Sequence, residues 1–298
     1  MNSKFKGTGV ALVTPFHKQG TIDFGSLEKM IEHCIGGGIN YLVIMGTTAE
    51  TATLSREEKL ALSEYVIEVV NQRVPLVLGI GGNNTQEVVN ILRTNSFEGF
   101  DAILSVTPYY NKPQQRGLYL HYKSIAVVSP IPIIMYNVPS RTSVNMKPEI
   151  VLQLANDFDN IIGIKEASGN IEQVMEIVRL KHKDFLVISG DDLLTLPLLA
   201  MGCDGVISVS ANAYPQEVSQ MVQLGIKGEM KKAREIHYRI SEFTKALFAD
   251  GNPAGIKAAL EIKGLISNHL RLPLVKVEKN LYNHITNLIS ELDSKTNS

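Results

Sequence analysis

The sequence has few cysteines, which excludes the small secreted proteins that depend on a disulfide framework. Only Cys34 and Cys203 occur among 298 residues. Both lie in apolar, periodic segments, where a free thiol usually acts as a small hydrophobic side chain. We therefore expect a reducing environment and predict a cytoplasmic protein.

An excess of one charge and long hydrophobic runs are also missing. The 29 Lys and Arg residues are balanced by 30 Asp and Glu residues, for a formal net charge of -1, whereas nucleic-acid binding needs a clustered cationic excess. No stretch approaches the ~18 uninterrupted apolar residues of a membrane span, and MNSKFKGTG at the start lacks the apolar core of a signal peptide. We predict neither nucleic acid nor a membrane as a partner.

Motifs for metal ions and nucleotide cofactors are absent as well. The seven histidines show no HxH or HExxH spacing, and there is no Walker A loop. The glycine-rich stretch at 79–84 departs from the dinucleotide fingerprint at Asn84. We predict no metal site and no cofactor, which disfavours a zinc-dependent aldolase.

What the sequence does have is a series of eight short apolar runs, each followed by a stretch with helical periodicity. Their near-continuous hydrophobicity indicates parallel strands that are buried on both faces. Eight such units in about 230 residues fit an α/β fold, a (β/α)8 TIM barrel, better than a doubly wound sheet. The predicted strands are 8–16, 41–46, 75–81, 102–108, 132–139, 161–168, 185–192 and 205–213.

The chain beyond about residue 215 carries no further strand pattern and is predicted to be helical. We divide the protein into a catalytic barrel, residues 1–228, and a helical C-terminal extension, residues 229–298, packed on the barrel. Within the barrel, SREE at 55–58 predicts a helix that begins with a capping box.

Lys165 is the strongest candidate for chemistry because it lies inside an apolar strand. Alternation along the strand places it on one face with Ile161 and Gly163. If that face is the barrel interior, partial desolvation favours the neutral amine, a nucleophile that forms Schiff bases with carbonyl compounds. The alternative is a structural lysine paired with Glu166 or with an aspartate of GDD at 190–192.

Polar residues also close the neighbouring strands, where such a barrel builds its active site. Tyr136 is either a proton shuttle or a core residue. Thr47 and Thr48 either hold a carboxylate or form a simple turn. Arg141 either binds a carboxylate with both arms of its guanidinium or lies in solvent.

These segments resemble the dihydrodipicolinate synthase and N-acetylneuraminate lyase superfamily of Schiff-base aldolases, and the dihydrodipicolinate synthase branch most closely. The resemblance extends from about residue 7 to beyond 270 and rests on GTTAET (46–51), VTPYYNKP (106–113), YNVPSRT (136–142), IIGIKEASGN (161–170), SGDD (189–192) and GVISVSAN (205–212). One departure is Ala49, where the branch usually has glycine. We expect its methyl group to shift Thr47 and Thr48 slightly without abolishing activity.

The resemblance implies a role for several side chains in an aldol reaction. Lys165 would form an imine with pyruvate, and Tyr136 would be the proton donor. Thr47 and Tyr110 would complete a proton relay with Tyr136, and in that family the tyrosine matching Tyr110 comes from a neighbouring subunit.

The same resemblance implies how the substrates are held. Thr48 and the backbone of Ile207 would bind pyruvate, Gly190 would belong to the same substrate site, and Arg141 would bind the carboxylate of L-aspartate 4-semialdehyde. The implied reaction is the condensation of pyruvate with this aldehyde, the first committed step of diaminopimelate and lysine biosynthesis. The implied assembly is a homo-oligomer, a tetramer built as a dimer of dimers.

Feedback inhibition by lysine, known in many relatives, would use a separate pocket at a dimer interface. Arg56 and Lys59 stand where lysine-sensitive relatives often carry histidines, and the extra positive charges oppose the ligand's ammonium group. We therefore expect weak inhibition or none. The positions that match the pocket are Thr51, Ala52, Asn83, Glu87 and Tyr109.

Two other functions compete with this one. The first is another pyruvate-dependent aldolase, such as an N-acetylneuraminate lyase or a 2-keto-3-deoxy-acid aldolase, and Arg141 argues against it because sugar-acid lyases generally lack an arginine in that loop. The second is a barrel that binds 2-oxo acids without turnover, which the complete set of Lys165, Tyr136, Thr48 and Arg141 disfavours.

Overall fold

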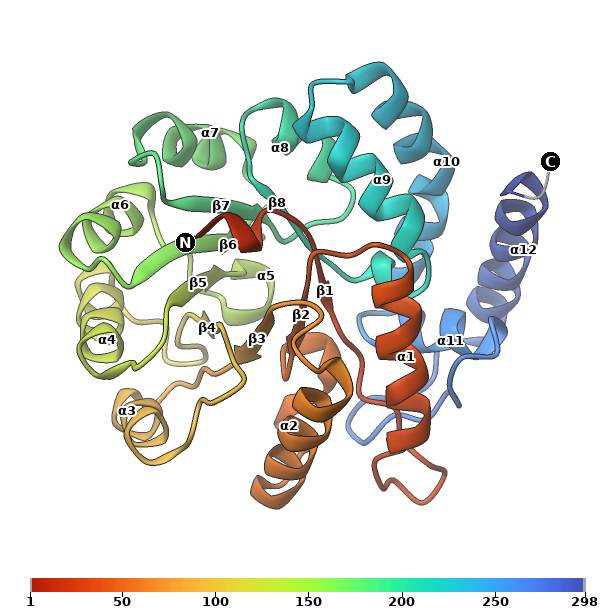
Figure 1. Ribbon diagram of the computed structural model, residues 1–298, viewed down its shortest axis with the longest axis horizontal. Coiled ribbons are helices and arrows are strands. Elements are labelled where there is room, and N and C mark those ends of the chain that lie inside the picture. The colour runs from red at the N-terminus through yellow and green to blue at the C-terminus, as the bar shows by residue number, and fades with distance from the viewer. Residues whose placement is uncertain (1, 297–298) are drawn as a thin grey trace.

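The eight predicted strands close into one parallel barrel. In the computed structural model, which describes residues 2–296, each strand pairs with the next and the last pairs with the first (Figure 1). The predicted (β/α)8 TIM barrel is confirmed. The strands are β1 (Gly7–Ala11), β2 (Tyr41–Ile44), β3 (Leu76–Gly79), β4 (Ala102–Val106), β5 (Ile133–Asn137), β6 (Ile161–Glu166), β7 (Leu186–Ser189) and β8 (Gly205–Ser208).

The strands are buried on both faces, which explains their continuous hydrophobicity. Side chains such as Tyr41, Leu104 and Ile207 fill the barrel interior, and a larger cluster packs between the strands and the helices. Phe5, in the 3₁₀ helix η1 (Asn2–Phe5), belongs to the interior cluster and meets Tyr41 edge to face, with ring centroids 5.7 Å apart. The barrel is therefore a packed core and not a pore.

Helices alternate with the strands and form the outer layer (Figure 1). The predicted capping box is confirmed: the Glu58 N–H donates to Ser55 Oγ at 3.2 Å, and the Ser55 N–H donates to Glu58 Oε2 at 2.9 Å. Cys34 and Cys203 are buried free thiols in this layer. The helices are α1 (Phe24–Gly36), α2 (Arg56–Val70), α3 (Thr85–Thr94), α4 (Gln115–Val128), α6 (Pro148–Asp157), α7 (Ile171–Leu180), α8 (Thr195–Ala200) and α9 (Pro215–Ile226), with short turns η2 (Thr47–Ala49), η3 (Thr51–Thr53), α5 (Pro139–Thr142) and η4 (Ser210–Asn212) after strands β2, β5 and β8.

One predicted detail of strand β6 is wrong. The β5–β6 register shifts by one residue, so that Ile133 pairs with Ile161 whereas Ile134 pairs with Gly163. This irregularity turns Ile161 toward the helices, and Ile162 packs in the interior instead. Ile161 therefore does not share a face with Lys165. A β-bulge has this effect because it adds one residue to one strand.

The C-terminal extension consists of α10 (Met230–Phe248), α11 (Ala254–Ile262) and α12 (Lys279–Thr296). Helix α10 packs on α9, and both α11 and α12 pack on α10. The boundary at residue 228 stays a prediction. Within residues 2–296, no helix is long and apolar enough to cross a membrane.

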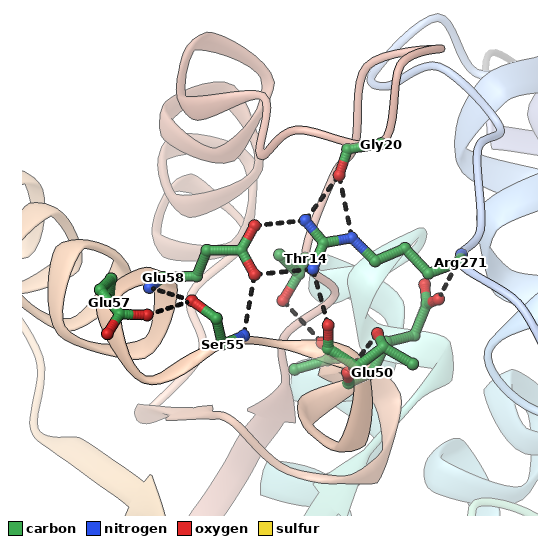
Figure 2. A network of polar contacts seen from close by, with 9 residues as sticks. Thr14, Gly20, Glu50, Ser55, Glu57, Glu58 and Arg271 are labelled. Atoms are coloured by element: carbon green, nitrogen blue, oxygen red, sulfur yellow. Dashed lines mark hydrogen bonds and ion pairs between the residues drawn. The ribbon is translucent and has the colours of Figure 1, made fainter.

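Hydrogen bonds and ion pairs connect the extension to the loop after β2. Arg271 lies between Gly20 and Glu58 (Figure 2); its Nε donates to the Gly20 carbonyl at 2.9 Å and its Nη1 to Glu58 Oε2 at 2.7 Å. The Arg271 N–H donates to Glu50 Oε2 at 3.0 Å, and Glu50 forms an ion pair with Lys257 in which both side chains are fully buried. The extension is thus bound to the rim of the barrel by buried charges.

Candidate active site

A cavity of about 450 Å³ lies at the end of the barrel where the strands finish. The extension supplies part of its wall through Lys245, Phe248, Ala249 and Asn252. Six of the residues singled out from the sequence line it: Thr47, Thr48, Tyr136, Arg141, Lys165 and Gly190.

Lys165 and Tyr136 face each other inside this cavity. The two residues are direct partners in the β5–β6 register, and the Lys165 Nζ lies 4.5 Å from the centroid of the Tyr136 ring. Lys165 is 6 % exposed, and no side chain in the described part of the chain forms a hydrogen bond or an ion pair with its ammonium group. The structural pairing with Glu166 or with Asp191 and Asp192 is therefore not made.

A polar network lies on the other side of the strands, directly behind this pair. The Glu166 carboxylate accepts hydrogen bonds from Asn137 Nδ2 at 3.0 Å, from Gln173 Nε2 at 3.0 Å and from the Ser168 N–H at 2.7 Å. Burial raises the pKa of Glu166, and these hydrogen bonds oppose that effect. Since Asn137 and Glu166 directly follow Tyr136 and Lys165, the network fixes the two strand ends relative to each other.

Asp192 is a half-buried acid that lines the same cavity, and the sequence analysis did not place it among the site residues. Its carboxylate accepts hydrogen bonds from the Ser208 hydroxyl and, at 3.0 Å, from the Val209 N–H. Burial raises the pKa of Asp192, while these hydrogen bonds and the charge of Lys165 lower it. The sequence signal for Asp192 is the GDD triplet at the end of a strand, residues 190–192.

The turn after β2 carries the two threonines. Thr48 is buried, and its Oγ accepts a hydrogen bond from Asn252 Nδ2 at 3.0 Å. Glu50 ends the turn in the left-handed backbone region, with a φ of 55°. Ala49 has no positive φ, so its methyl group meets no backbone strain in this turn.

Arg141 lies in the short helix α5, directly after β5. It is exposed and lines the cavity, and its Nη2 donates to the Asn252 carbonyl at 3.2 Å. A guanidinium in this place can bind an anionic group of a molecule held in the cavity.

Two predicted site residues do not line the cavity. Ile207 is buried in the barrel interior as part of β8. Tyr110 is 83 % exposed and has a φ of 74°. Within a single chain the Tyr110 side chain faces solvent instead of Lys165.

The positions predicted for lysine binding lie outside the cavity. The Thr51 hydroxyl donates to the Gly46 carbonyl at 3.0 Å, and the other four side chains, Ala52, Asn83, Glu87 and Tyr109, are exposed. Their assignment to a lysine-binding pocket stays a prediction.

In the described residues, no group of three or more His, Cys, Asp or Glu side chains is placed to hold a metal ion. The expectation that the protein binds no metal also stays a prediction.

The fold and this site define the class: a (β/α)8 barrel with a buried, unpaired lysine beside a tyrosine at the carboxyl end of its strands. Comparison with known proteins agrees. The sequence model described as the dihydrodipicolinate synthetase family matches residues 4–292. A 4-hydroxy-tetrahydrodipicolinate synthase from Flavobacterium psychrophilum is 52% identical over 281 residues, covering 94% of this chain and 96% of that protein. One from Parabacteroides distasonis is 50% identical over 290 residues, covering 97% and 98%.

Solved structures agree as well. Dihydrodipicolinate synthase from Thermotoga maritima superimposes with a TM-score of 0.95 at 39% identity, covering 97% of this chain and 99% of that one. The chloride-inhibited enzyme from Acinetobacter baumannii, solved in complex with pyruvate, gives a TM-score of 0.94 at 38% identity, with coverage of 97% and 99%. The chain belongs to the dihydrodipicolinate synthetase family, and the resemblance seen in the sequence is confirmed.

An unpaired buried amine predicts covalent capture of a carbonyl compound. Borohydride reduces an imine to a stable amine, so borohydride added with pyruvate should attach one pyruvate-derived group to the chain and inactivate it. Intact mass and peptide mass spectrometry check this. Lys165→Ala should abolish the labelling, whereas Lys245→Ala, which removes the other lysine that lines the cavity, should leave it in place. Labelling at any other lysine would contradict the assignment.

Proposed function

We propose that this protein is a 4-hydroxy-tetrahydrodipicolinate synthase, which condenses pyruvate with L-aspartate 4-semialdehyde through an imine on Lys165. The single observation that carries this proposal is the buried Lys165 amine without an ionic partner, 4.5 Å from the Tyr136 ring. Membership of the family and the names of the chain's relatives support the assignment of these two substrates. We propose that the protein is located in the cytoplasm. Its reaction would be the first committed step of diaminopimelate and lysine biosynthesis.

The reaction begins with attack of the neutral Lys165 amine on C2 of pyruvate. The carbinolamine loses water to give the imine, and Tyr136 is proposed to supply and remove the protons of this step. The protonated imine acidifies the pyruvate methyl group, which loses a proton to form an enamine. Thr48, the backbone of Ile207 and Gly190 are proposed to hold the pyruvate unit during these steps.

The enamine carbon then attacks the aldehyde carbon of the second substrate, and the new alkoxide takes a proton from Tyr136. The amino group of the aldol product attacks the imine carbon and displaces the Lys165 amine, which closes the ring and releases the product. Thr47 is proposed to relay protons to Tyr136. Arg141 is proposed to bind the semialdehyde carboxylate, which fits its position on the cavity wall.

Arg141 distinguishes this reaction from that of a sugar-acid lyase. The protein should turn over pyruvate with aspartate semialdehyde and leave N-acetylneuraminate uncleaved, as measured by coupled assays run side by side. Arg141→Ala should raise the KM for the semialdehyde roughly 10- to 100-fold, because a hydrogen-bonded charge is worth about 1.5–3 kcal/mol. Trapping of pyruvate on Lys165 should persist in that variant. Preferred cleavage of N-acetylneuraminate would favour the alternative aldolase.

We further propose a homo-oligomer, a tetramer built from dimers, in which Tyr110 acts in the site of a neighbouring subunit. The 83 % exposure of Tyr110 in the single chain supports this. Tyr110→Phe and Lys165→Ala proteins should each be weakly active or inactive. After subunit exchange in an equal mixture, about a quarter of the sites should regain both residues, since a two-fold dimer exchanges the tyrosines reciprocally. Proven exchange without recovery of activity would place Tyr110 in its own site.

Inhibition by lysine is proposed to be weak. A lysine ammonium at ~6 Å from the charge of Arg56 or Lys59 is opposed by roughly 0.7 kcal/mol in bulk water and about 2.8 kcal/mol at an effective dielectric of 20. Replacing both residues with histidine should therefore increase sensitivity to L-lysine in a steady-state assay above neutral pH. Half-inhibition of the unmodified protein by sub-millimolar lysine would show that these charges do not matter.

A further inference from the structure

Asn252 connects the two residues that are proposed to bind the substrate carboxylates. It lies just before α11 in the C-terminal extension, is 8 % exposed and lines the cavity. Its Nδ2 donates to Thr48 Oγ at 3.0 Å, and its backbone carbonyl accepts from Arg141 Nη2 at 3.2 Å. One residue from outside the barrel thus contacts both carboxylate sites.

The direction of the Asn252–Thr48 hydrogen bond determines what Thr48 can do. A hydroxyl has one hydrogen to donate and two lone pairs to accept with. Because the Asn252 amide is the donor, the Thr48 oxygen uses a lone pair and keeps its hydrogen for another acceptor. A carboxylate accepts hydrogen bonds and donates none. The Thr48 hydroxyl is therefore free to donate a hydrogen bond to a carboxylate in the cavity.

The surrounding contacts hold Asn252 in this position. Lys257, one and a half turns further along, pairs with Glu50 and donates to the His269 carbonyl at 2.9 Å. Gly255 packs so closely on α10 that an added Cβ would lie 2.1 Å from the Leu247 carbonyl oxygen. The segment 252–257 therefore contacts the turn after β2 at two points, through Thr48 and through Glu50.

We propose that Asn252 is a positioning residue for the pyruvate carboxylate: it keeps the Thr48 hydroxyl as a donor and anchors Arg141 at the mouth of the cavity. This inference rests on the proposed function. It assigns to the C-terminal extension a direct part in substrate binding, beyond packing against the barrel.

The test compares Asn252→Asp and Asn252→Ala with the unmodified protein. An aspartate accepts the Thr48 proton and brings a negative charge toward the substrate carboxylate. It should raise the pyruvate concentration for half-maximal borohydride inactivation roughly 10- to 100-fold. Alanine removes a neutral hydrogen bond and should raise it roughly two- to tenfold. The kcat at saturating pyruvate, from the coupled assay, should change much less than the half-saturating concentration in both variants.

Two controls separate positioning from general loss of structure. Asn268 is also a buried asparagine of the extension and does not line the cavity, so Asn268→Ala should leave half-saturation by pyruvate unchanged. In a Thr48→Val background, Asn252→Ala should add no more than about a twofold effect, because the two residues act as one unit.

Each outcome decides the question. If pyruvate is not trapped on the unmodified protein, the proposed function fails. If it is trapped, and the Asn252 variants keep normal half-saturation or lose only kcat, the inference about Asn252 is overturned. Independent, additive effects of the Thr48 and Asn252 substitutions would also overturn it. Should Asn252→Asp fail to fold, Asn252→Ala and the double variant decide by the same measures.

Discussion

The pairing of strand β5 with β6 is the constraint on which the site depends. Its register places Tyr136 opposite Lys165 inside the barrel and Asn137 opposite Glu166 on the outer side. A slip by one residue would exchange the two faces, because successive side chains of a strand point in opposite directions. Glu166 would then enter the cavity and Lys165 the helix layer. The hydrogen bonds that Glu166 accepts from Asn137, Ser168 and Gln173 therefore stabilise the arrangement in which the lysine has no ionic partner.

A second constraint acts across the rim of the barrel. The turn after β2 contains Glu50, whose buried carboxylate is neutralised by Lys257 from the extension. Burial lowers the pKa of Lys257 to about 8, although the charge of Glu50 raises it. Removing one partner of such a pair leaves an uncompensated buried charge, at a cost of about 3–5 kcal/mol. The barrel and the extension are thus energetically interdependent at the turn that carries Thr47 and Thr48.

The fold could be predicted from the sequence because the signals for each strand and helix are local to that segment of the chain. Eight buried strands and the capping box at Ser55 follow from hydrophobic pattern and capping chemistry, and both are confirmed. The face of Ile161 was predicted wrongly, since a β-bulge changes the alternation without a local signal. Lys165 could be selected because a lysine in an apolar strand is unusual.

The remaining parts of the site depend on contacts between distant segments. Asn252 and Thr48 are separated by 204 positions in the chain, and no periodicity connects them. The Glu50–Lys257 ion pair could not be predicted from the sequence for the same reason. The roles given to Ile207, Tyr110 and Gly190 follow from family resemblance and not from a local pattern, and the Tyr110 side chain is exposed within a single chain.

The central claim is that Lys165 carries the reaction as an imine, and a crystal structure of the protein grown with pyruvate tests it most directly. We expect continuous covalent density between Lys165 Nζ and C2 of pyruvate, with the pyruvate carboxylate within hydrogen-bond distance of the Thr48 hydroxyl. Pyruvate bound without a covalent bond to Lys165, or bonded to a different lysine, would contradict the claim.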